Sequence, residues 1–140
     1  MRILGIDYGD VRTGIAITDS LGITAQGLET INNNNSDRVL LRRLEEIINE
    51  YIVERIAIGM PLNLKGEKTV RAEKTEKFIH KLKCKFNNIP IEVIDERLTT
   101  VQAHKTMNFL DVNKKKKKDI VDTIAAVYIL ETYLGKLNKK

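Results

Sequence analysis

The chain has 140 residues, of which 42% are hydrophobic and 31% are charged, and its formal net charge is +5. This length supplies one hydrophobic core and is too short for two ordinary domains, so we expect a single domain over residues 1–140. The one cysteine, Cys84, excludes an intramolecular disulfide and favours a reducing compartment. With only two histidines besides, the composition also argues against a zinc site, which usually needs three or four nitrogen or sulfur ligands.

The sequence shows no sign of secretion or of insertion into a membrane. Acidic residues follow only a few apolar ones at the N-terminus, which is unlike a signal peptide. No apolar run approaches the roughly 20 residues that span a bilayer. We therefore expect a soluble, cytoplasmic protein with no membrane partner.

The first part of the chain predicts three short strands, Arg2–Asp7, Arg12–Thr18 and Thr24–Ile31, separated by glycine and aspartate. Short connections of this kind favour an antiparallel meander. The asparagine run Asn32–Asn35 predicts a turn. Ser36 is then a suitable N-cap for an amphipathic helix. The apolar face expected on this helix consists of Leu40, Leu44, Ile47, Ile48, Tyr51 and Ile52.

The rest of the chain alternates between strand and helix patterns. Its second amphipathic helix begins at about Thr69 and places Thr75, Phe78, Ile79, Leu82 and Phe86 on one side. Before that helix we expect a strand at Arg55–Ile58 and a loop at Gly59–Gly66. After it we expect a strand at Ile91–Asp95, a helix capped by Thr99 or Thr100, and a last helix from about Asp119 to Leu134.

This order of elements predicts an α/β fold with a five-stranded mixed sheet covered by helices on both faces. Right-handed crossovers place the fourth strand beside the first and the fifth beyond it, which gives the strand order 3-2-1-4-5. The ends of the first and fourth strands then lie together near the middle of the sheet.

Several acidic residues occupy positions where a charge is costly. Asp7 closes the first strand, Asp95 and Glu96 close the fifth, and Asp122 lies in a helix that is apolar around most of its circumference. A carboxylate in an apolar setting needs a partner, or its pKa rises. The economical interpretation is that these acids share Mg²⁺ or Mn²⁺, which prefer oxygen ligands. Two such ions can support phosphodiester hydrolysis.

The competing interpretation is that these residues are ordinary strand-end acids and helix caps. Their spacing does not prove that they converge. Nor does it choose between Asp95 and Glu96, because successive residues of a strand face opposite sides of the sheet. Asp119 lies one turn before Asp122 and faces the same way along the helix.

The positive charge is concentrated in one run of five lysines, whose charge equals the net charge of the chain. The run consists of Lys114, Lys115, Lys116, Lys117 and Lys118. Such a block is either a solvated loop or a contact for a polyanion such as nucleic acid. Arg12 and Arg97 flank the proposed acidic site, where they either hold phosphate or form salt bridges with the acids.

Five motifs along the whole chain, in order, resemble those of the YqgF/RuvX family. They are Ile6-Asp7-Tyr8-Gly9, Arg12-Thr13-Gly14-Ile15-Ala16, Gly59-Met60-Pro61-Leu62-Asn63, Asp95-Glu96-Arg97-Leu98-Thr99-Thr100 and Asp122-Thr123-Ile124-Ala125-Ala126. Members are described as candidate Holliday junction resolvases and as nucleases that mature the 5′ end of pre-16S rRNA. The resemblance implies a ribonuclease H-like fold and a Mg²⁺- or Mn²⁺-dependent endonuclease or exonuclease.

The same resemblance implies roles for individual residues. Asp7, Glu96 and Asp122 match the catalytic, metal-binding acids of the family, which favours Glu96 over Asp95. Asp119 and Asp122 resemble the closing Asp-x-x-Asp of the related RuvC resolvases, so Asp119 is a candidate fourth ligand. The implied partner is structured RNA or branched DNA, and the sequence leaves both substrates open, as well as a monomer or a homodimer.

Two other functions compete with hydrolysis of nucleic acid. An actin-like or sugar-kinase-like ATPase also uses Asp-x-Gly before a glycine hairpin, but it needs a second phosphate loop, and Asp7-Tyr8-Gly9 is the only Asp-x-Gly in this chain. The second alternative is a non-catalytic nucleic-acid-binding factor in ribosome biogenesis or transcription. A metal-dependent cleavage assay separates this alternative from the nuclease.

Overall fold

The computed structural model describes residues 1–63, 65–95 and 114–138, and within the last segment the side chains of residues 123–137. In chain order its elements are β1 (Arg2–Asp7), β2 (Arg12–Thr18), β3 (Ala25–Asn32), α1 (Asp37–Tyr51), β4 (Val53–Met60), α2 (Val70–Lys85), β5 (Ile91–Asp95) and α4 (Lys114–Asn138). The helix that was expected to begin at Thr99 or Thr100 lies outside the described residues.

The five strands form one sheet in the order β3-β2-β1-β4-β5, as the sequence predicted. β1 and β3 both run antiparallel to β2, whereas β1, β4 and β5 are parallel to one another. The carboxyl ends of these three parallel strands therefore lie at the same edge of the sheet. Asp7 ends β1 at this edge, and Asp95 ends β5 there.

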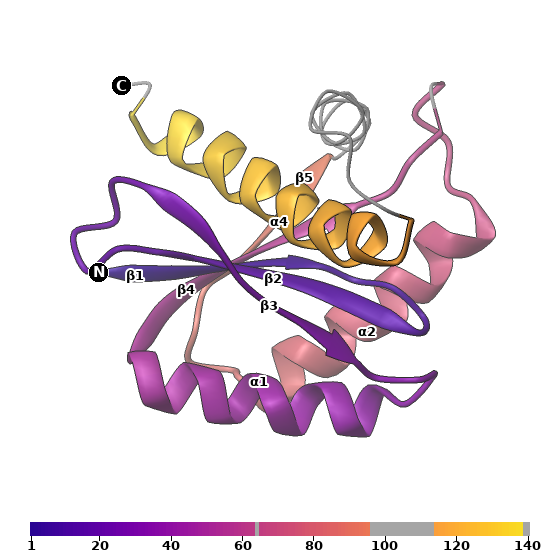
Figure 1. The fold of residues 1–140 in the computed structure, drawn as a ribbon, viewed down its shortest axis with the longest axis horizontal. Coiled ribbons are helices and arrows are strands. Elements are labelled where there is room, and N and C mark those ends of the chain that lie inside the picture. The colour runs from indigo at the N-terminus through magenta and orange to yellow at the C-terminus, as the bar shows by residue number, and fades with distance from the viewer. Residues whose placement is uncertain (64, 96–113, 139–140) are drawn as a thin grey trace.

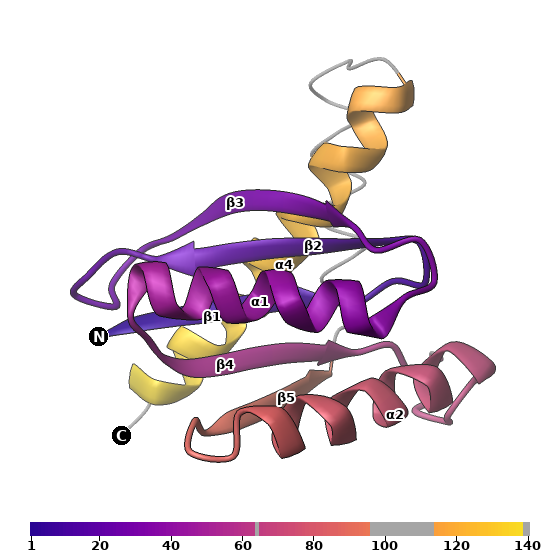
Figure 2. The same ribbon diagram turned by 90° about the horizontal axis from the view of Figure 1, so that it is seen from below.

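Helices cover both faces of the sheet: α1 and α2 pack on one face, and α4 crosses the other (Figures 1 and 2). Strand alternation divides the core between these faces. The buried side chains on the α1/α2 face include Leu4, Ile6, Ile56, Ile58, Leu40, Leu44, Phe78 and Leu82. Those on the α4 face include Ile3, Ala16, Ala57, Ile94, Ala126, Ile129 and Leu130.

The N-cap predicted for α1 and the start predicted for α2 at about Thr69 are confirmed. The Ser36 hydroxyl accepts a hydrogen bond from the Val39 amide at 3.2 Å, and the Thr69 hydroxyl accepts one from the Ala72 amide at 3.2 Å. The apolar face predicted for α2 is buried, and so is most of that predicted for α1. Ile52 is the exception: it is the C-cap of α1 in a left-handed conformation, with φ 54°, and it is 75% exposed.

The last helix is longer than the sequence predicted. α4 begins at Lys114 and not at about Asp119, so the backbone of the lysine run is helical, and the interpretation of this run as a loop was wrong. Lysine is a good helix former at exposed positions, which allows the helix to extend ahead of its apolar part. No helix in the described part of the chain is long and apolar enough to cross a membrane.

α4 lies unusually close to the sheet because glycines face it. A Cβ added at Gly5 would lie 2.9 Å from the carbonyl oxygen of Ala126, and one added at Gly27 would lie 2.0 Å from Cγ2 of Thr123. The Thr123 hydroxyl lies 3.1 Å from that of Thr30 on β3. The small side chain of Ala126 on α4 also permits this approach, and Ala126 is fully buried.

This close approach predicts that Gly5→Ala destabilises the protein. The new methyl group meets a backbone oxygen that can move only with the helix, so we expect a loss of about 1–3 kcal/mol in the free energy of unfolding. Gly135→Ala is the matched control, because nothing lies within 4 Å of a Cβ at that position. Alanine at this helical position should be neutral or stabilising by up to about 1 kcal/mol. Urea denaturation of both variants measures the difference, and equal stabilities would contradict the proposed contact.

Candidate active site

Asp7 is a buried carboxylate at the carboxyl end of β1, with 8% of the residue exposed. It shares the α4 face of the strand with Ile3 and Gly5, because alternate residues of a strand point the same way. Its partner on β2 is Gly14. On β4, Ile58 pairs with Ile6, so the next residue, Gly59, lies beside Asp7. Glycines therefore flank Asp7 on both sides, and no neighbouring side chain in the sheet covers its carboxylate from these positions.

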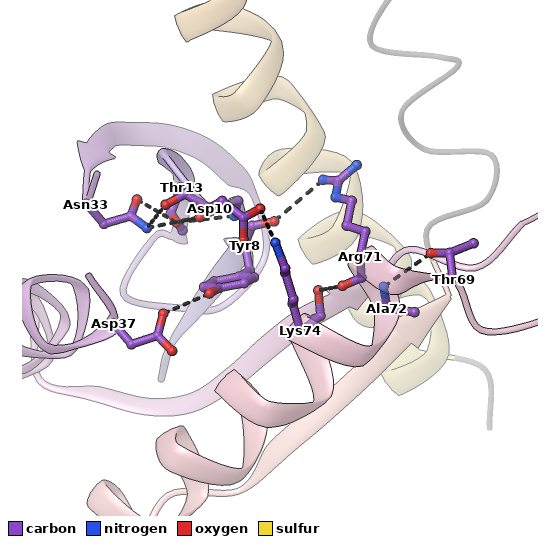
Figure 3. Close-up of polar contacts among 11 residues, drawn as sticks. Tyr8, Asp10, Thr13, Asn33, Asp37, Thr69, Arg71, Ala72 and Lys74 are labelled. Atoms are coloured by element: carbon purple, nitrogen blue, oxygen red, sulfur yellow. Dashed lines mark hydrogen bonds and ion pairs between the residues drawn. The ribbon is translucent and has the colours of Figure 1, made fainter. Parts of the chain in front are cut away.

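The loop that follows Asp7 is held by the side chain of Asn33, which is 1% exposed. Its amide nitrogen donates to the carbonyl oxygens of Gly9 and Asp10, at 2.9 and 3.1 Å, and its oxygen accepts from the Thr13 hydroxyl at 3.1 Å (Figure 3). A Cβ at Gly9 would lie 2.2 Å from the carbonyl oxygen of Arg12, so this turn requires glycine. The asparagine run is the turn that the sequence predicted, and Asn33 also braces the backbone next to Asp7.

Tyr8 is a packing residue of this loop. Its ring stacks on that of Phe78, with centroids 4.5 Å apart. Its hydroxyl donates to Asp37 Oδ1 at 2.7 Å (Figure 3). Burial and the neighbouring Asp37 carboxylate raise the pKa of Tyr8 well above its usual value. The residue is only 7% exposed, so its ring face is taken up by protein and not offered to a nucleic-acid base.

Two basic residues of α2 extend toward the loop after β1 (Figure 3). Nη2 of Arg71 lies 3.8 Å from Asp7 Oδ1, and Nζ of Lys74 lies 3.1 Å from Asp10 Oδ2. Neither residue was predicted from the sequence, because nothing in the local pattern of α2 connects it with Asp7. The carboxylate of Asp7 thus has a positively charged side chain near it in the described structure.

The described part of α4 brings the Asp122 segment over the sheet near Asp7. The carbonyl of Ala126 faces Gly5, two residues before Asp7 on β1. Asp122 lies one helical turn before Ala126, on the same stripe of the helix. Thr123, which follows Asp122, contacts Thr30 on β3. Thr30 pairs with Gly14 of β2, and Gly14 pairs with Asp7. The backbone of the Asp122 turn is therefore positioned over the same row of the sheet.

The remaining predicted residues are placed as follows. Asp95 ends β5, and because its neighbour Ile94 packs on the α4 face, alternation assigns Asp95 to the opposite face from Asp7. Arg12 is half-buried at the start of β2. Asp119 and the five lysines lie on the helical backbone of α4, and the side chains of residues 114–122 are outside the described structure. Glu96 and Arg97 also lie outside it.

A divalent metal is compatible with the donor chemistry of Asp7. It is a hard oxygen donor, buried at a strand end and flanked by glycines. Among the side chains that the structure describes, no group of three or more His, Cys, Asp or Glu residues is arranged to hold a metal ion. The described structure thus supplies the side chain of one proposed ligand, Asp7; of the others, Asp119 and Asp122 are described by their backbone alone, and Glu96 lies outside the described residues.

Comparison with known proteins identifies a family and close relatives. Residues 1–136 match the RuvX family model, described as Holliday junction resolvase. The chain is 54% identical to a protein of Ruminiclostridium cellulolyticum, with 100% of this chain and 99% of the relative covered. It is 42% identical to a protein of Bacillus subtilis, with 99% and 100% covered. Both relatives carry the provisional name pre-16S rRNA nuclease.

Solved structures show the same fold at low sequence identity. RuvC of Thermus thermophilus, in complex with a Holliday junction substrate, has a TM-score of 0.57 at 12% identity, with 99% of this chain and 96% of that chain covered. The fowlpox virus Holliday junction resolvase has a TM-score of 0.55 at 16% identity, with 98% and 99% covered. The ribonuclease H-like fold implied by the sequence motifs is confirmed.

The hydrogen bonds of Asn33 predict that Asn33→Ala destabilises the protein and weakens its site. The substitution leaves two carbonyls and a hydroxyl without this partner in a buried place, so we expect a loss of about 2–4 kcal/mol in the free energy of unfolding. Asn35→Gly is the control, because Asn35 is exposed and has φ 65°, which glycine adopts readily. That variant should stay within about 0.5 kcal/mol of the parent. Chemical denaturation measures the free energy of unfolding of both variants. Similar losses in the two would contradict the bracing role of Asn33.

Proposed function

This chain belongs to the RuvX family and is a nuclease, and we propose that it hydrolyses phosphodiester bonds of precursor 16S rRNA with a divalent metal at Asp7. The relatives that carry the pre-16S rRNA nuclease name are 42–54% identical to this chain over almost its full length. Such similarity supports carrying the substrate class over to this chain. The exposed thiol of Cys84 is in keeping with action in the reducing cytoplasm.

The observation that carries this proposal is the placement of Asp7. Its carboxylate is buried, ends a central strand and is flanked by glycines, although burying a charge is costly. An acid serving only as a strand end needs neither this burial nor these small neighbours. Binding a cation that reaches a phosphate is a function that requires both.

The proposed ligands of the metal are Asp7, Glu96 and Asp122, with Asp119 as a further candidate. Oxygen donors of this kind suit Mg²⁺ or Mn²⁺. When bound, such an ion supplies Lewis acidity and lowers the pKa of water for attack on the phosphodiester. The contribution of the protein is to hold the acids together. β1 fixes Asp7, and α4 carries Asp122 one helical turn before Ala126, whose carbonyl faces Gly5.

The described strands favour Glu96 over Asp95 as the ligand from β5. Ile94 packs on the α4 face, which is also the face of Asp7, and so alternation directs Asp95 away from it. The sequence alone left this choice open. The alternation of the described residues supports the choice implied by the family motifs.

Nucleic acid is the proposed partner, and the basic residues are its proposed contacts. Lys114–Lys118 form the start of the helix that carries Asp119 and Asp122, so a phosphate backbone that reaches the acids passes near them. Arg12 and Arg97 are proposed as phosphate contacts next to the acids. Because five consecutive helical residues are distributed around the whole circumference, we expect about two of the lysines to share one phosphate-facing side.

Branched DNA is the second candidate substrate, and the description of the family model favours it. Symmetric cleavage of a junction needs two active sites, so this function predicts a homodimer, whereas processing of one RNA end is possible for a monomer. A non-catalytic role in ribosome biogenesis or transcription is the remaining alternative. A metal-dependent cleavage assay with both nucleic acids separates these three functions.

Asp7→Asn should abolish Mg²⁺- or Mn²⁺-dependent cleavage while the fold remains intact. The amide keeps the size of the side chain but loses the charge that binds a divalent cation, so we expect a loss of at least about 100-fold. The measurement is cleavage of a pre-16S 5′-end fragment and of a four-way junction, with and without EDTA. Product lengths distinguish endonuclease from exonuclease action. Cleavage by the pure variant at near the parent rate would refute the proposed site.

Replacing Lys114–Lys118 with glutamine should weaken nucleic-acid binding and flatten its dependence on salt. Each phosphate that a lysine no longer neutralises lowers the slope of log affinity against log salt by about 0.7 on single strands and about 0.9 on B-DNA. Because about two of the lysines face phosphate, we expect the slope to fall by about 1.5. The control replaces Lys77 and Lys83, two exposed lysines of α2, which covers the opposite face of the sheet from α4. Binding titrations at several salt concentrations measure both slopes, and equal reductions per lysine would assign no special role to the run.

A further inference from the structure

We propose that Arg71 is a phosphate-binding residue of this site, which lies beside Asp7 in this structure and turns to the substrate when a divalent cation binds Asp7. This inference rests on the proposed function, because it takes Asp7 as a metal ligand. It adds a residue that none of the sequence motifs includes, and it makes metal binding a condition for one of the contacts to the substrate.

The first support is the geometry of the Arg71–Asp7 pair. Nη2 of Arg71 lies 3.8 Å from Asp7 Oδ1 and 3.5 Å from the carbonyl oxygen of Tyr8. Both distances exceed the usual range of about 2.7–3.2 Å for an N–H···O hydrogen bond. Both of these contacts of the guanidinium are therefore longer than ordinary hydrogen bonds. An ion pair of this length is readily exchanged for a cation that contacts the carboxylate directly.

The second support is the contrast between the two ends of the Arg71 side chain. Its backbone is fixed in the first turn of α2, where Thr69 caps the helix and the Thr75 hydroxyl donates to the Arg71 carbonyl at 2.9 Å. Ala72 and Thr75 are fully buried and anchor the same turn. The Arg71 side chain is 55% exposed, whereas that of Asp7 is 9% exposed. The base of Arg71 is thus held in place, and more than half of its side chain is exposed to solvent.

The chemistry of the two groups gives the order of events. A divalent cation at Asp7 repels the guanidinium and competes with it for the carboxylate oxygens. Once displaced, the guanidinium lies beside the place where a phosphodiester meets the metal. Its planar pair of N–H donors matches two phosphate oxygens, which a lysine ammonium does not do. Arg71 therefore opposes metal binding in the free protein and strengthens substrate binding in the metal-loaded protein.

Lys74 provides a matched control on the same helix. Its side chain is 53% exposed, close to the 55% of Arg71, and it also pairs with a carboxylate of the β1–β2 loop, at 3.1 Å. That carboxylate belongs to Asp10, whose side chain is 45% exposed and is not among the proposed metal ligands. Lys74→Gln therefore removes an equal charge near the site without changing the environment of Asp7.

The experiment compares Arg71→Gln, Arg71→Lys and Lys74→Gln with the parent protein in two binding measurements. Calorimetric titration with Mg²⁺, without nucleic acid, should show at least about threefold tighter binding for Arg71→Gln and no change for Lys74→Gln. Binding of a fluorescent RNA hairpin is then measured in EDTA and in Ca²⁺, under conditions where no cleavage is observed. For Arg71→Gln we expect about tenfold weaker binding in Ca²⁺ and less than about twofold weaker binding in EDTA. Arg71→Lys should recover part of the affinity.

The outcomes distinguish this inference from the proposed function. Unchanged Mg²⁺ affinity in Arg71→Gln, or equal losses of RNA affinity in EDTA and in Ca²⁺, would overturn the role of Arg71 while a Mg²⁺ response of the parent leaves the metal site standing. A parent protein that binds no Mg²⁺, or binds it as well after Asp7→Asn, would overturn the proposed metal site and this inference together. Circular dichroism of each variant confirms that the fold is retained before these comparisons.

Discussion

The approach of α4 to the sheet is the constraint on which the rest of the structure depends. Gly5 and Gly27 have no side chains where α4 crosses, and the carbonyl of Ala126 and the methyl of Thr123 occupy that space. A wider separation would lift the Asp122 turn away from the row of Asp7. The same packing buries Ala126, Ile129 and Leu130 against the sheet. Stability and the geometry of the proposed site therefore depend on one contact, and the small residues that permit it serve both.

The two sides of the sheet contribute differently to the site. On the α1/α2 side, Asn33 holds the backbone after Asp7, and Tyr8 is fixed between Phe78 and Asp37, so the loop has little freedom. On the same side the first turn of α2 carries Arg71, whose charged group is exposed. The acid is thus buried, whereas more than half of the Arg71 side chain is exposed. That division suits the proposed site, in which Asp7 holds a cation and a polyanion approaches from solvent.

The sequence predicted most of the fold, and the reasons are local. Short apolar segments between turn residues identified all five strands, Ser36 and Thr69 marked helix starts, and the handedness of the crossovers gave the strand order. Ile52 continued the apolar pattern of α1, yet it ends that helix in a left-handed conformation that is unfavourable for a β-branched residue, which no local rule indicates. The start of α4 was missed because a lysine run fits an exposed loop and an exposed helix equally well.

The site was predictable only where chemistry and local pattern coincide. Asp7 was identifiable because a charge follows a buried strand, whereas Arg71 reaches the same loop from 63 positions beyond Tyr8 and carries no local sign of it. The Asp95–Glu96 choice shows the limit most clearly. Alternation along β5 is certain from the sequence, but the face on which it starts is decided by the packing of Ile94 against α4. Long-range packing therefore favours one residue of an otherwise equivalent pair as the proposed ligand. It does so through the same helix whose approach the glycines allow.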